Sequence, residues 1–117
     1  YYPPHPTWDR LHEIFLAGFR VDGADPLIGR RVPGIFEDAG LTEIQVEARM
    51  DVYPRGHSRR AIRLELLRTM RPKLVASGIV GETEFDDLDH SAQELLNDPR
   101  TLVLPILFFL VTGRRPE

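Results

Sequence analysis

The sequence contains no cysteine, carries little net charge and has no long hydrophobic run. The absence of Cys excludes disulfide frameworks, thiolate metal sites, iron–sulfur clusters and Cys nucleophiles. The 15 Lys and Arg residues nearly balance 18 Asp and Glu, and a net charge of −3 gives no general attraction to nucleic acid or anionic lipid. The longest apolar run, Leu102–Val111, is well short of the roughly 18 residues that cross a bilayer as a helix. We therefore expect a cytoplasmic protein without a nucleic-acid or membrane partner.

What is present is enough for one folded domain. The chain has 117 residues, of which 42% are hydrophobic, so it can bury one core but not two. The chain opens at Tyr1 within a Pro-rich stretch, and we expect it to be a piece of a longer protein. Nine Gly and ten Pro residues punctuate the rest and mark the ends of its elements.

Four segments have apolar residues at helical spacing. They lie at 7–21, 28–40, 58–78 and 83–97. Thr7, Ser58 and Thr83 are residues of the type that caps a helix, and we expect each to begin one. Pro33 must lie early in the second helix or bend it, and Pro72 is expected to kink or split the third, because an interior proline removes a backbone hydrogen bond.

Two segments have the patterns of strands. Residues 43–53 alternate apolar and polar side chains, which indicates a strand that is wet on one face. Residues 102–112 are almost continuously apolar, which predicts a strand covered on both faces, with Pro105 at its entry. One other strand is too few to cover it, so absent sequence or a second copy should supply the missing neighbour. In isolation we expect an α+β fold of about four helices and two antiparallel strands.

Residues 25–41, which include the sequence GRRVPGIFEDAGL just before the alternating strand, resemble a segment of a known family. This segment resembles the late part of class I S-adenosylmethionine-dependent methyltransferases of the ubiquinone and menaquinone biosynthesis type. The tail VTGRRP at 111–116 looks like the family's ending, and the helical region 54–98 looks like an insertion over the substrate pocket. The resemblance implies an α/β parent with a Rossmann-like sheet whose last strand inserts antiparallel between the fifth and sixth.

The resemblance also implies that the cofactor half lies upstream of this chain. The sequence contains no GxGxG turn and no acidic residue closing a second strand, the features with which the family binds S-adenosylmethionine. We therefore expect the parent protein to bind S-adenosylmethionine and methylate a small molecule, and the isolated chain to bind no cofactor and be inactive. Expected segments are a connector and first helix at 1–23, a helix and strand at 24–53, the helical lid at 54–98, and the last strand and tail at 99–117.

The resemblance places candidate substrate contacts at the start of the chain. Tyr1, Tyr2, His5 and Trp8 would follow the fifth strand, and ligands bind at the carboxyl ends of strands in such sheets. Methyl transfer needs positioning and at most one proton acceptor, for which His5 is the candidate. The alternative is that these residues are the aromatic packing of a Pro-rich connector.

Arginines at the second helix are further candidates. Arg30 and Arg31 lie at its start, where the helix dipole does not favour them, so they could bind a substrate carboxylate or phosphate. Tyr53 and His57, at the end of the first strand, are weaker candidates for the same role. The alternative for both arginines is an ordinary place on the surface.

The charges of the last two helices are of opposite sign. The third helix is basic and the fourth acidic, so they could attract one another in a helical hairpin. A helix-turn-helix is disfavoured because the second helix would carry its negative charges into the DNA groove. No His or carboxylate pair has metal-ligand spacing, and the acidic residues 86, 87 and 89 are interpreted as a solvated face. The alternative function is a non-enzymatic α+β interaction domain that forms a homodimer through the exposed edge of residues 102–112.

Overall fold

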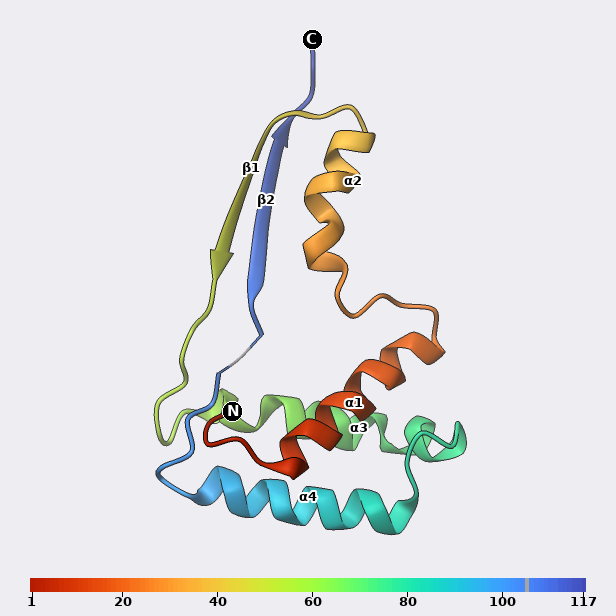
Figure 1. The fold of residues 1–117 in the computed structure, drawn as a ribbon, viewed down its shortest axis with the longest axis vertical. Coiled ribbons are helices and arrows are strands. Elements are labelled where there is room, and N and C mark those ends of the chain that lie inside the picture. Colours follow the sequence, from red (N-terminus) through yellow and green to blue (C-terminus); the bar gives the residue numbers. More distant parts are fainter. Residues whose placement is uncertain (105) are drawn as a thin grey trace. The chain divides into compact units, whose positions relative to one another are not determined.

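The computed structural model describes residues 1–104 and 106–117. Within them the chain forms four α-helices and one two-stranded antiparallel sheet (Figure 1). The elements are α1 (Pro6–Val21), α2 (Val32–Asp38), β1 (Thr42–Arg49), α3 (Ile62–Ala76), α4 (Glu82–Asn97) and β2 (Phe108–Arg114), with short 3₁₀ helices at Ile28–Arg31 and Ser58–Ala61. The expected α+β class and element order are confirmed.

The chain divides into two compact units. The helical unit comprises residues 1–24 and 52–104, and therefore holds α1, α3 and α4. The strand unit comprises residues 25–51 and the described residues from 106 onward, and holds α2, β1 and β2.

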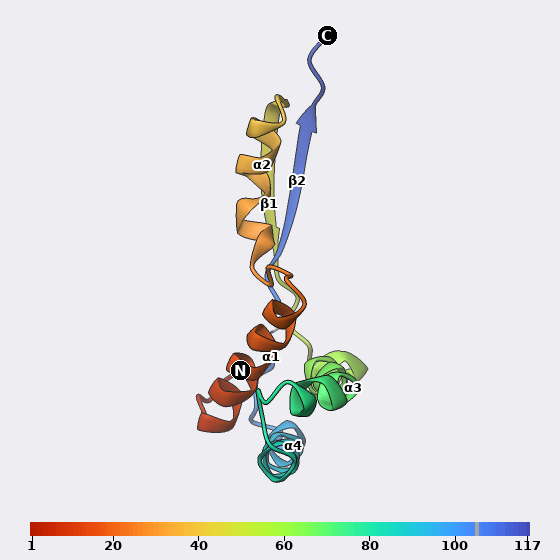
Figure 2. The same cartoon turned by 90° about the vertical axis from the view of Figure 1, so that its right-hand side faces the viewer.

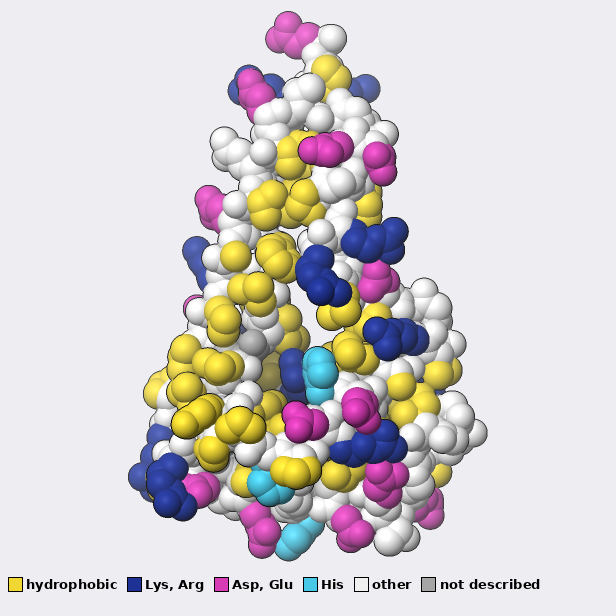
Figure 3. Space-filling view, viewed as in Figure 1, with side chains coloured by type: hydrophobic (Ala, Val, Ile, Leu, Met, Phe, Trp, Pro, Cys, Tyr) yellow, Lys and Arg dark blue, Asp and Glu magenta, His cyan; other side chains and the backbone are white. Residues whose placement is uncertain are grey.

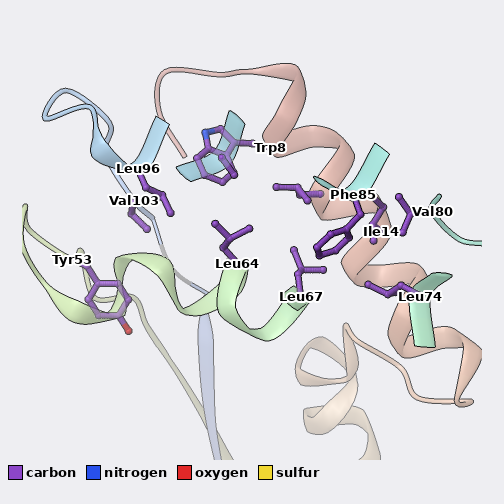
Figure 4. Packing of buried hydrophobic residues seen from close by; sticks show 12 residues of the cluster. Trp8, Ile14, Tyr53, Leu64, Leu67, Leu74, Val80, Phe85, Leu96 and Val103 are labelled. Carbon is purple, nitrogen blue, oxygen red and sulfur yellow. The ribbon is translucent and has the colours of Figure 1, made fainter. Parts of the chain in front are cut away.

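The helical unit has a core of its own. Its helices α1, α3 and α4 contact one another pairwise, and Figure 2 looks nearly along α3 and α4 with α1 beside them. The core side chains come from all three helices, from the segment before α3 and from the segments after α3 and α4 (Figure 4). They are Trp8, Leu11, Ile14, Tyr53, Leu64, Leu67, Leu74, Val80, Phe85, Ala92, Leu96 and Val103. Along each helix the buried positions are three, four or seven residues apart, which gives each helix one buried face. Apolar spacing overestimates that face in α3, where Ile62 is 51% exposed and Leu66 40% exposed.

Close approach of α1 and α3 depends on Gly18. A Cβ atom at this position would lie 2.6 Å from Cε of Met70 and 2.8 Å from Cδ2 of Leu74. Both distances are shorter than a carbon–carbon contact, so a larger residue would force the helices or their side chains apart.

The predicted caps were wrong at all three helix starts. His5 caps α1 in place of Thr7, because its Nδ1 accepts the hydrogen bond of the Thr7 backbone N–H at 3.1 Å. Thr7 is buried inside the helix, where its hydroxyl lies 2.8 Å from that of Ser91. An imidazole nitrogen two residues upstream thus replaces the expected hydroxyl.

The same substitution occurs before α3. His57, not Ser58, accepts from the backbone N–H of Arg59, at 3.0 Å. The third cap fails differently, because α4 begins at Glu82 behind Gly81 and has no side-chain cap.

The prolines behave partly as expected. Pro33 lies in the first turn of α2, as predicted. Pro72 lies inside α3, which runs as one helix from Ile62 to Ala76, so the predicted split does not occur. The helix ends before Gly78, whose φ of +74° is a left-handed conformation that glycine adopts without strain.

The strand unit is a helix packed on a two-stranded sheet. Val46 pairs with Val111 and Ala48 with Phe109, so these four side chains share one face. Helix α2 covers this face. Gly113 lies on the same face of β2 as Val111, and a Cβ atom at Gly113 would lie 3.2 Å from a ring carbon of the α2 residue Phe36. The opposite face carries polar residues of β1 and mainly apolar residues of β2. They are Gln45, Glu47 and Arg49 on β1, and Phe108, Leu110 and Thr112 on β2.

The last strand differs from its prediction in extent and coverage. It begins at Phe108, six residues later than expected, and Leu102 and Val103 instead form single bridges with Tyr2 and Tyr53. Phe108 is 55% exposed and Leu110 59% exposed, so the strand is not covered on both faces. The residue expected at its entry, Pro105, lies outside the described residues. The apolar composition of residues 102–112 predicted a strand correctly. The residue at which the strand begins depends on which residues of β1 pair with it, and the apolar segment alone does not specify that register.

Candidate functional site

The aromatic residues at the start of the chain pack into the core. The ring of Tyr1 stacks on that of Trp8 with centroids 3.8 Å apart and planes 7° from parallel. Trp8 is 7% exposed and packs with Leu11 and Leu64. Burial raises the pKa of the Tyr1 hydroxyl, and the positive charge of Arg63 opposes that rise. For Trp8 the packing alternative therefore describes the structure better than an open substrate pocket.

The other two candidates in this region have different surroundings. Tyr2 is 62% exposed, and its backbone exchanges hydrogen bonds with Leu102 at 2.9 and 2.7 Å. His5 uses Nδ1 as the helix cap, so the proton of the neutral ring is on Nε2. To accept a proton from a substrate, His5 would have to give up the cap. This geometry does not favour His5 as a general base.

The candidate arginines belong to the strand unit. Both lie on the 3₁₀ helix before α2, and both are exposed. Arg31 donates from Nη1 to Oδ2 of Asp25 at 3.0 Å, while Oδ1 of the same carboxylate accepts from the Leu27 backbone at 2.9 Å. Arg30 has no ion pair among the described residues. The five candidate residues thus divide between the two units, with Tyr2, His5 and Trp8 in one and Arg30 and Arg31 in the other.

Two ion pairs join the basic helix α3 to the acidic helix α4, consistent with the predicted attraction. Arg68 holds Asp89 through Nε and Nη2, the shortest contact being 2.6 Å, and Arg71 reaches Asp86 at 2.9 Å. The acidic residues 86 and 89 are therefore ion-paired rather than simply solvated. Among the described residues no group of three or more His, Cys, Asp or Glu side chains could hold a metal ion.

A donor-rich hollow in the helical unit was not predicted as a whole. We call it the basic hollow, and residues 55–58, 60–61, 93 and 96–99 line it. One wall is the turn after Tyr53, and the other is the end of α4. Sequence reasoning had singled out His57 as an anion contact. It missed the α4 wall, because residues about forty positions apart in the chain come together only through the fold.

The turn wall has a defined conformation. The His57 backbone N–H donates to the Pro54 carbonyl at 3.0 Å, and Gly56 between them has a φ of +82°. This is the arrangement of a β-turn whose third residue favours glycine. The His57 ring stacks on the buried Tyr53, with centroids 4.7 Å apart. Ring stacking and the cap to Arg59 together fix the orientation of the imidazole.

Arg60 fastens this turn to the α4 wall. Its Nη2 donates to the carbonyls of Leu96 at 3.3 Å and Thr101 at 3.0 Å. The guanidinium thereby satisfies a carbonyl at the end of α4 that has no partner within the helix.

The residues of this chain do not fit a cofactor site for S-adenosylmethionine. Within the described residues β1 is followed by a segment with a single glycine, Gly56, and not by a Gly-rich turn that opens a helix. The prediction that the isolated chain binds no cofactor remains to be tested. No helix of the described chain is long and apolar enough to cross a membrane.

Comparisons with known proteins identify no relative: no family model, curated protein or solved structure matches the chain.

Proposed function

We propose that this chain is the C-terminal, substrate-side portion of an S-adenosylmethionine-dependent small-molecule methyltransferase, and that it is inactive by itself. The observation that carries the proposal is the antiparallel pairing of β1 with β2 across a two-helix insertion. The resemblance requires this order: a helix, the sixth strand, an inserted helical lid, and a seventh strand antiparallel to the sixth. The register, with Val46 opposite Val111, joins the two segments that carry the resemblance.

The unpaired edge of β2 supports the same proposal. Among the described residues β2 pairs with β1 alone, although its side chains are apolar on both faces. In the proposed parent protein, a strand of the cofactor half would pair with this edge. Other elements of that half would pack on the exposed face of the sheet and cover Phe108 and Leu110. Because each of these side chains is already nearly half buried, covering it would contribute about half of the roughly 1.5–3 kcal/mol that full burial of an exposed side chain provides. In this proposal α3 and α4 form the lid, and the substrate is a small methyl acceptor.

Cofactor binding tests the proposal directly. The experiment titrates S-adenosylmethionine into the 117-residue chain and into the longer protein that carries it, by isothermal titration calorimetry. We expect binding by the longer protein and none by the chain alone, because the chain lacks the residues that fit the cofactor. Binding by the chain alone, or failure of the longer protein to bind, would contradict the proposal.

The exposed edge also favours the second candidate, an α+β interaction domain that forms a homodimer. Two β2 edges could pair across a two-fold axis, which would place apolar strands in the middle and polar β1 strands outside. Light scattering of the chain over a wide concentration range distinguishes this candidate. A mass that doubles with concentration supports the dimer, and a constant monomeric mass contradicts it.

A further inference from the structure

The basic hollow is an open depression in the surface of the helical unit. Its volume is about 320 Å³, at the lower end of the range found for small-molecule pockets. Its walls come from one unit, and Arg60 holds the two walls together through its bonds to Leu96 and Thr101. The hollow is therefore defined by fixed backbone as well as by side chains.

The charge lining the hollow is positive. Arg55 and Arg60 supply two positive charges, and Asp98 is the one carboxylate among the lining residues. Arg100 already neutralises Asp98, donating to it from Nε at 3.2 Å, from Nη2 at 3.1 Å and from its backbone N–H at 2.8 Å. These hydrogen bonds from Arg100 lower the pKa of Asp98, which favours the ionised carboxylate that Arg100 binds.

Several donors of the hollow have no acceptor among the described residues. Arg55 is exposed and forms no ion pair there, and Arg60 uses only Nη2 for its two bonds, which leaves Nε and Nη1. His57 accepts at Nδ1, so its Nε2 carries a proton that it can donate. The Ser58 hydroxyl can donate as well.

We propose that the basic hollow binds the oxyanion group, phosphate or carboxylate, of a small molecule. Guanidinium groups form charge-assisted hydrogen bonds to such oxyanions, often two at once. The imidazole N–H and the serine hydroxyl add neutral donors of the kind that complete an oxyanion's shell. Neither a cation nor an apolar ligand would satisfy this set of donors. The inference does not depend on the methyltransferase proposal.

A titration of the full 117-residue chain tests the inference. Inorganic phosphate and acetate are added separately at constant ionic strength, with sodium chloride as the reference, and ¹H–¹⁵N spectra follow each backbone amide. We expect saturable shifts confined to residues 54–61 and 93–101. Saturation by phosphate alone assigns a phosphate-bearing ligand, and saturation by acetate assigns a carboxylate. Absence of saturable shifts with both anions would overturn the inference.

Three variants separate this site from general electrostatic attraction. Arg55→Gln removes a free guanidinium without breaking a contact, and should weaken anion binding about tenfold, as expected for loss of a charged hydrogen bond. Arg20→Gln removes an exposed arginine of α1 that does not line the hollow, and should leave binding unchanged. His57→Asn keeps an acceptor for the Arg59 N–H and removes the imidazole donor, and should weaken binding severalfold. Equal affinity of Arg55→Gln and Arg20→Gln would overturn the inference.

Discussion

The two units of the chain differ in how much they bury. All twelve hydrophobic side chains of the buried core belong to the helical unit. Within the described residues the strand unit buries no side chain fully, and Val46, Phe108 and Leu110 are each about half exposed or more. Figure 3 shows hydrophobic side chains gathered over β1 and β2 on the face in view. The helical unit has the core of a self-supporting fold, whereas the part of the strand unit that the structure describes has two strands and one covering helix.

This difference has a simple energetic basis. A two-stranded sheet is marginally stable by itself and needs more strands or a packed layer. In the strand unit α2 covers one face, and the other face and one edge of each strand have no cover among the described residues. The helical unit instead packs three helices around shared side chains. We therefore expect a substitution to cost much in one unit and little in the other, unless a further strand completes the sheet.

We expect the largest difference in the free energy of unfolding between two matched phenylalanine truncations, one in each unit. Phe85→Ala empties a site that is 1% exposed, and should lower the free energy of unfolding by about 3–5 kcal/mol. Phe108→Ala, at a residue 55% exposed, should cost about 0.5 kcal/mol or less in the same chain. Urea unfolding followed by circular dichroism measures both. Similar costs for the two variants would remove the distinction between the units.

A lysine introduced on the exposed face of β2 tests whether a further layer covers the strand unit in the longer protein. Leu110→Lys should leave the isolated chain almost unchanged, because the side chain is 59% exposed. In the longer protein that our proposal assigns to it, the same lysine would lie under a covering layer and cost about 2 kcal/mol or more. Thermal unfolding of both forms checks this. Equal effects in the two forms would argue against a missing layer over β2.

Glycine substitutions test packing within each unit. Gly18→Ala adds a methyl group within 2.6 Å of Met70, and should cost about 1–3 kcal/mol. Gly34→Ala, in α2, has no atom within 4 Å of the added methyl, and should be neutral or stabilise by about 0.5 kcal/mol. The midpoint of urea unfolding distinguishes them. A neutral Gly18→Ala would show that the ends of the Met70 and Leu74 side chains move aside at little cost.

The smallest expected effect is a pH dependence of the helical unit. The Arg10 guanidinium, 2.7 Å from the Glu84 carboxylate, lowers the pKa of Glu84 below its ordinary value of 4.5. A lowered folded pKa means that the contribution is present above pH 4.5 and is lost as the pH falls through the folded value. Glu84→Gln should therefore flatten part of the decline in stability below pH 4.5. An unchanged pH profile would show that the pair adds nothing measurable, as for many exposed ion pairs.

Local patterns were predictable, and long-range ones were not. The stripe through Phe85 and Ala92 follows from spacing within one helix, and the structure buries both. The cap of α1 was missed because the His5 imidazole performs a role expected of a hydroxyl. The start of β2 was missed because an apolar run does not specify which residues find partners. The basic hollow depends on Arg60 reaching the end of α4, a contact that no local pattern encodes.

Hydrogen exchange tests most directly whether the strand unit is an incomplete sheet. The experiment measures amide exchange of β2 and of α3 in the isolated chain and in the longer methyltransferase that we propose. The account predicts that β2 exchanges much faster than α3 in the isolated chain, and that its protection rises to that of α3 in the longer protein. Equal protection of β2 and α3 in the isolated chain, unchanged in the longer protein, would contradict it.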